Sequence, residues 1–186
     1  MARWKQALAL FGIQPLEIEM HAMTQGTKKA ATAGQQDTTL SPERPAPLSP
    51  EAALLLAQAR NAAFAEAAQG RLGLGMSMLK HALEQEPLSH DLMSDLAALL
   101  LSAGELAQAA QHAKHALELH PHHGPSLYTL AFACSGLGKA AQAQKTLRHL
   151  LHVEPRALDS LLDEAPDLLP VARTELARLD ALLGGA

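Results

Sequence analysis

The sequence predicts an all-α protein, and three observations support this fold class. The chain has 186 residues, of which 37 are Ala and 36 are Leu, and both residue types are strong helix formers. Only 3% of the residues are aromatic, and β-branched residues are also few, which disfavours a β-protein. Finally, Gly and Pro recur at a fixed interval along the chain, which is typical of repeated helical units.

Charge, cysteine content and hydropathy exclude several classes of function. The formal net charge of −4 is small and has the wrong sign for nucleic-acid binding. The single cysteine, Cys134, excludes an intrachain disulfide and a multi-cysteine zinc site, and it favours a reducing compartment such as the cytoplasm. No apolar run reaches the roughly 18 residues of a membrane-spanning helix.

The N-terminal part of the chain is expected to lie outside the main domain. Residues 1–19 are predicted to form a short amphipathic segment, with Trp4, Leu8 and Phe11 on one helical face. Such a segment either packs on the main domain or anchors a partner or a membrane surface. Residues 20–49 are rich in small, polar and proline residues and are predicted to be a disordered linker.

A first long helix is predicted from residue 50 to about Ala68. Ser49 is suited to the N-cap, Pro50 to the first helical position, and Glu51 to the positive end of the helix. The Ala-rich sequence that follows has no helix breaker before Gly70.

From this helix onward the sequence repeats with a period of 34 residues. Pro87, Pro121 and Pro155 keep this interval, as do Gly70, Gly104 and Gly138. Each unit is predicted to contain a helix, a turn at the glycine, a second helix and a proline that ends it. We expect three units at residues 50–89, 90–123 and 124–157, because a single Ala-rich hairpin cannot bury its apolar face alone.

These units resemble the tetratricopeptide repeat, a helix-turn-helix unit of 34 residues. The best match is the second unit, with Leu96-Ala97, Leu100, Gly104, Ala109 and Ala116-Leu117-Glu118-Leu119-His120-Pro121. The large aromatic residues of the family pattern are missing. Its Tyr column holds Glu66, Leu100 and Cys134, and its Phe column holds Leu79, Ala113 and Leu147.

The period ends after Pro155, and residues 158–186 are expected to cap the last repeat. A helix is predicted from Pro170 to Leu183, after a break at Ala165-Pro166-Asp167. Without such a cap, the last hairpin would expose its apolar flank.

The family resemblance implies a right-handed α-α superhelix whose first helices line a concave groove. The groove columns suggest a partner-binding site at Arg60, Phe64, Asp91, Ser94, Leu101, Tyr128 and Phe132. The aromatic residues in this set are the expected anchors for a partner peptide or helix. Alternatively, they pack against neighbouring helices or the N-terminal segment.

Some members of this family hold the C-terminal carboxylate of heat-shock chaperones with a set of cationic and amide side chains. The corresponding columns here hold Arg60, Phe64, Asp95, Pro125 and Thr129. A single cation beside an acid is poorly suited to a carboxylate pair, so this co-chaperone role is not expected.

Nine of the ten histidines lie between His81 and His152. A metal ion would best be sought at His112 with His115, or at His120, His122 and His123. Since no carboxylate or cysteine is nearby in sequence, we expect a solvated surface and predict no metal or other cofactor. We also predict no catalytic residue: Cys134 occupies a core column, and Asp163, Glu164 and Asp167 are expected to be helix caps.

The sequence therefore predicts a non-catalytic protein–protein interaction module that acts as an adaptor. Its small three-repeat domain, N-terminal extension and apolar groove are similar to those of bacterial type III secretion chaperones for translocator proteins. The alternative is a self-associating assembly subunit that uses the N-terminal helix or the edges of the repeat array.

Overall fold

The computed structural model describes residues 49–184, which form eight α-helices and contain no strand. The all-α prediction is confirmed. The predicted amphipathic segment at 1–19, and the predicted linker apart from Ser49, lie outside the described residues. The helices are α2 (Pro50–Ala68), α3 (Leu72–Gln85), α4 (His90–Ala103), α5 (Leu106–Leu119), α6 (Gly124–Gly136), α7 (Ala140–Arg148), α8 (Pro155–Glu164) and α9 (Leu168–Gly184), with a π-helical turn η1 (His149–Val153) after α7.

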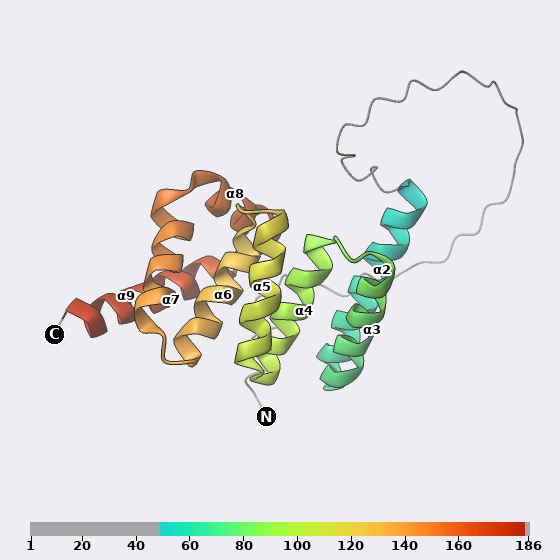
Figure 1. Cartoon of the computed structure of the whole chain (residues 1–186), viewed down its shortest axis with the longest axis horizontal. Helices are drawn as coiled ribbons and strands as arrows, with labels where there is room; N and C mark the ends of the chain where they lie inside the picture. The colour runs from blue at the N-terminus through green and yellow to red at the C-terminus, as the bar shows by residue number, and fades with distance from the viewer. Residues whose placement is uncertain (1–48, 185–186) are drawn as a thin grey trace, which may run out of the picture.

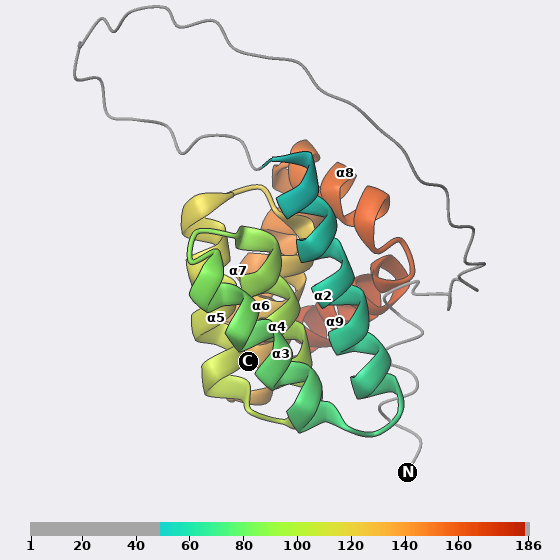
Figure 2. The same ribbon diagram turned by 90° about the vertical axis from the view of Figure 1, so that its right-hand side faces the viewer.

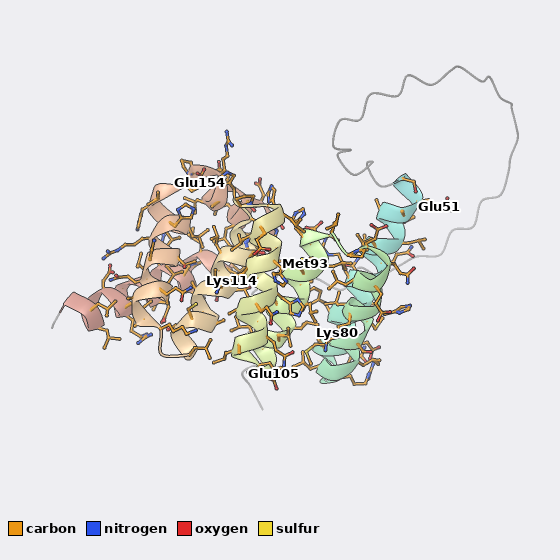
Figure 3. The ribbon with its side chains drawn as sticks, in the orientation of Figure 1. Glu51, Lys80, Met93, Glu105, Lys114 and Glu154 are labelled. Carbon is orange, nitrogen blue, oxygen red and sulfur yellow. The ribbon has the colours of Figure 1, made fainter. Side chains whose placement is uncertain are left out.

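Consecutive helices pair into hairpins that stand side by side in a row (Figure 1). The first helices α2, α4 and α6 contact their own second helices α3, α5 and α7, and each second helix α3 and α5 contacts the first helix of the next hairpin. Viewed from the α2/α3 end, α3, α5 and α7 lie on one side, and α2, α8 and α9 lie toward the other (Figure 2). Lys80 of α3 and Lys114 of α5 project from the second-helix side (Figure 3).

The glycine column ends the first helix of each hairpin. Gly70, Gly104 and Gly138 have φ values of 82°, 81° and 75°, which side chains other than glycine rarely adopt. The backbone N–H groups of Arg71, Glu105 and Lys139 bond to carbonyls of the preceding helical turn. These turns reverse the chain where the period predicts it.

Small residues allow the paired helices to pack closely. Ala63, Ala97 and Ala131 occupy one column of the repeat and are each 0% exposed. Gly75 is also buried, and a Cβ atom there would lie 2.4 Å from the backbone oxygen of Ala63. Helices α2 and α3 can therefore approach this closely only because residue 75 has no side chain.

The third hairpin departs from the regular repeat at η1. The Glu154 N–H donates to the His149 carbonyl oxygen, 3.0 Å away and five residues earlier. This wider turn lets two consecutive residues, Leu150 and Leu151, both face the core, with exposures of 0% and 8%. The 34-residue period alone does not predict the π-helical turn, because Pro155 keeps its column.

The C-terminal region forms two helices, and the second starts earlier than expected. Helix α9 begins at Leu168, whereas the sequence predicted a start at Pro170. Leu168 is 1% exposed and joins the core. Pro170 is tolerated in the first turn because its missing N–H would have no partner there. Helix α9 packs against α7. No helix within residues 49–184 has the length and hydropathy needed to cross a membrane.

Candidate binding cleft

A cleft of about 340 Å³ opens on the side of the first helices, between α2, α4, the start of α6 and the end of α8. We refer to it as the first-helix cleft. Its lining residues are Ala57, Arg60, Asn61, Phe64, Ser94, Asp95, His123, Pro125, Glu164 and Ala165.

One wall of the cleft is held by Arg60, which connects α2 to α4. Its guanidinium group donates two hydrogen bonds to the Asp95 carboxylate, one from Nε and one from Nη2 at 3.2 Å. Its Nη1 lies 3.6 Å from a carboxylate oxygen of Asp91. A two-point contact of this kind fixes the geometry of both side chains. The positive charge of Arg60 is thus already paired within the protein.

The opposite wall joins the α5–α6 connection to α8 through His123. His123 is 2% exposed, and its Nε2 lies 3.0 Å from Glu164 Oε2. Because an ionised carboxylate can only accept, this geometry places a proton on Nε2. His123 Nδ1, 2.7 Å from Ser126 Oγ, is then able to accept from the serine hydroxyl.

A glycine and a serine complete this wall. The Gly124 N–H donates to Ser160 Oγ at 3.0 Å, and Ser160 Oγ donates to Glu164 Oε1 at 2.9 Å. A Cβ at position 124 would lie 2.4 Å from the Ala157 carbonyl oxygen. The start of α6 therefore approaches α8 as closely as its backbone allows.

The ionised form of Glu164 is favoured at this position. Burial opposes its charge, but hydrogen bonds from His123 and Ser160 and the charge of Arg60 outweigh that effect, and the pKa of the carboxyl is lowered. The cleft thus carries one arginine against two acids, Asp95 and Glu164. A ligand that brings its own carboxylate finds no unpaired cation among the lining residues.

The predicted partner-binding residues divide into two groups. Arg60, Phe64 and Ser94 line the cleft, and Asp91 lies beside Arg60. Leu101, Tyr128 and Phe132 are not among its lining residues.

Tyr128 and Phe132 form a separate aromatic pair on α6. Their ring centroids are 4.3 Å apart and the rings stack at 27°. Tyr128 is only 5% exposed, and burial together with the nearby charge of Glu175 raises its pKa. Near the C-terminal end of α6, Ser135 donates a hydrogen bond to Glu175 of α9.

Sequence reasoning missed the far wall of the cleft. The sequence predicts that Glu164 is a helix cap, and it groups His123 with His120 and His122. These residues are 41 positions apart, outside the 34-residue period. No pattern in the sequence therefore indicates that they meet.

Cys134 has the environment that the sequence predicted. It is 2% exposed within the core, and burial raises the pKa of its thiol. A buried thiol with a raised pKa is a poor nucleophile, since the thiolate is the reactive form.

Comparisons with known proteins agree with the arrangement of these helices. A sequence profile of the tetratricopeptide repeat matches residues 100–164. The chain is similar in structure to the crystal structure of the Sgt2 TPR domain from Aspergillus fumigatus, with a TM-score of 0.56 and 16% sequence identity over 73% of this chain and 81% of that chain. No curated protein sequence matches this chain.

Proposed function

We propose that this domain, whose helices resemble those of tetratricopeptide-repeat domains, is a non-catalytic protein–protein interaction module and that its first-helix cleft binds a segment of a partner protein. The observation that carries this proposal is the cleft itself, which combines apolar and charged lining residues on the side of α2, α4 and α6. Its volume of about 340 Å³ suits one or two side chains of an inserted segment rather than a whole helix.

The residues that line the first-helix cleft indicate which kind of partner segment it would bind. Ala57 is exposed, and the buried residues Phe64, Pro125 and Ala165 complete the apolar part of the lining, which favours an apolar anchor side chain. Glu164 is partly exposed and ionised, and it favours a neighbouring Lys, Arg or amide donor. We therefore expect segments with an apolar anchor next to a basic residue.

A display library of random peptides tests this proposal, with affinities of selected peptides measured by fluorescence anisotropy. Ala57→Trp should fill the exposed mouth of the cleft and weaken binding at least about tenfold. The matched control is Ala107→Trp, on the exposed surface of the second helix α5, and it should leave the affinity unchanged. Equal affinities of the two variants would refute the cleft as the binding site.

The remaining predicted residues need their own variant. Phe132 is partly buried against the core, so Phe132→Ala reports whether a partner extends beyond the cleft along α6. A partner captured equally well by this variant and by the unaltered chain would limit the site to the cleft. Leu101 is expected to contribute to the same outer part of the site.

The proposed role is that of an adaptor in the cytoplasm, similar to a secretion chaperone. The single buried cysteine supports a reducing compartment. The resemblance to bacterial type III secretion chaperones stays a prediction that partner identification would test.

Self-association is a second candidate, favoured by exposed leucines at the ends of the row of hairpins. Leu54 and Leu55 of α2 are 59% and 62% exposed, and Leu182 of α9 is 56% exposed. Exposed apolar patches often mark interfaces. Light scattering of the full chain and of the double variant Leu54→Glu/Leu55→Glu distinguishes the candidates, because an assembly subunit that uses this edge should lose oligomers while a peptide receptor keeps its affinity.

A further inference from the structure

We propose that His90, Asp91 and His123 form a binding site for a late first-row divalent metal ion such as Zn²⁺. Each of the three residues offers one ligand atom, and these atoms lie within 4.8 Å of one another. Among residues 49–184, this is the one set of three or more His, Cys, Asp or Glu residues with such spacing. The site goes beyond the proposed peptide-binding function.

The required movement is small. Zn²⁺–ligand bonds of about 2.0–2.1 Å in a tetrahedral arrangement place ligand atoms about 3.3 Å apart. The present limit of 4.8 Å therefore has to shrink by about 1.5 Å. The side chains of His90 and Asp91 are 35% and 36% exposed, so both have room to rotate toward the buried His123.

The donor set fits this class of metal. Two imidazole nitrogens and one carboxylate oxygen are typical ligands of Zn²⁺, whereas Mg²⁺ and Ca²⁺ prefer oxygen alone. His120 lies next to the set, with its ring centroid 4.8 Å from that of His90 and 5.9 Å from that of His123. A third imidazole thus lies beside the set.

The buried ligand, His123, already has contacts within the protein. Both nitrogens of His123 have partners, Ser126 and Glu164, so metal binding exchanges one of these contacts.

If the hydroxyl of Ser126 is displaced, Glu164 continues to accept from Nε2–H. A carboxylate that holds the second nitrogen of a metal-bound histidine is a common outer contact, because it orients the ring and increases its basicity. An ion at this position would connect the start of α4 to the α5–α6 connection, beside the first-helix cleft.

The test uses the full chain without a polyhistidine tag, freed of metal by a chelator and titrated with Zn²⁺ in a calorimeter. We expect one ion per chain. His90→Ala and Asp91→Asn should each weaken Zn²⁺ affinity by at least about tenfold. Both residues are partly exposed and lie at the start of a helix that Ser89 caps, so folding should persist, as circular dichroism will verify.

The matched control is the double variant His112→Ala/His115→Ala, which removes the histidine pair one turn apart on α5, with ring centroids at 6.5 Å. It should bind Zn²⁺ as the unaltered chain does. Co²⁺ provides a second readout, since its visible absorption reports ligation and should be lost in His90→Ala. Unchanged affinity of His90→Ala, loss of binding in the double variant, or no binding by the unaltered chain would each overturn the proposal. Peptide affinity measured in chelator is independent of this result.

Discussion

Gly75 offers a direct test of how closely the first two helices pack. A methyl group at this position would lie 2.4 Å from the Ala63 carbonyl oxygen and 3.3 Å from Leu99 Cδ1. The oxygen belongs to the backbone of α2 and cannot rotate away. Because ordinary contact begins near 3.4 Å, Gly75→Ala should push α3 away from α2 by about 1 Å and weaken core contacts on both sides.

The expected cost follows from two opposing effects. Overpacking of a well-packed core costs about 1–3 kcal/mol, while replacing a helical glycine by alanine stabilises by about 0.5–1 kcal/mol. Gly75→Ala should therefore lower the free energy of unfolding by about 0–2.5 kcal/mol. Gly73 is the matched control, because it lies in the same helix, is exposed, and a Cβ there meets nothing within 4 Å.

Gly73→Ala should leave stability unchanged or raise it by about 0.5–1 kcal/mol. The helix-forming effect is similar in both variants, so their difference of about 1–3 kcal/mol measures the close approach itself. Urea unfolding followed by circular dichroism gives both values, and hydrogen exchange of α2 and α3 reports whether these helices open first. If the two variants have the same stability within about 0.5 kcal/mol, our explanation of the buried glycine is wrong.

Four further substitutions test other parts of the structure. Leu147→Ala, at a side chain that is 0% exposed, should lower the free energy of unfolding by about 2–5 kcal/mol in urea unfolding. Gly124→Ala places a methyl group 2.4 Å from the Ala157 oxygen, so it should cost about 1–3 kcal/mol and reduce peptide affinity at the cleft, as measured by anisotropy. Ser49→Ala removes the hydroxyl that accepts from the Ala52 N–H at 3.1 Å and should cost about 0.5–2 kcal/mol, seen as faster hydrogen exchange in the first turn of α2. Burial, with smaller effects of His115 and Lys80, lowers the pKa of His112 below 6.5. The neutral imidazole therefore stabilises the fold fully above pH 6.5, and this contribution is lost as pH falls through the pKa of the folded state. The urea midpoint of His112→Gln should accordingly depend less on pH in this window.

Much of the architecture follows from the sequence because it depends on local rules. Gly70, Gly104 and Gly138 adopt the left-handed backbone that a helix end requires, and Ser49 caps the first described helix. The column of Ala63, Ala97 and Ala131 is buried in every hairpin. Spacing alone predicts the turns and the cap, since each depends on residues within one helix or one turn.

Gly75 shows where a local rule was incomplete. In the sequence it is a helix-weakening residue, with a cost of about 1 kcal/mol relative to Ala. In the structure, its missing side chain permits the contact between α2 and the start of α3. The benefit depends on a neighbouring helix, so helix propensity does not reveal it.

The sequence by itself determined the class of fold and the hairpin period. Only the tertiary structure decided which polar groups meet: Arg60 with Asp95, His123 with Glu164, and His90 and Asp91 with His123. The physical reason is that helix formation depends on neighbours along the chain. Contacts between hairpins depend instead on the rotation and separation of helices, which the packing of small residues sets.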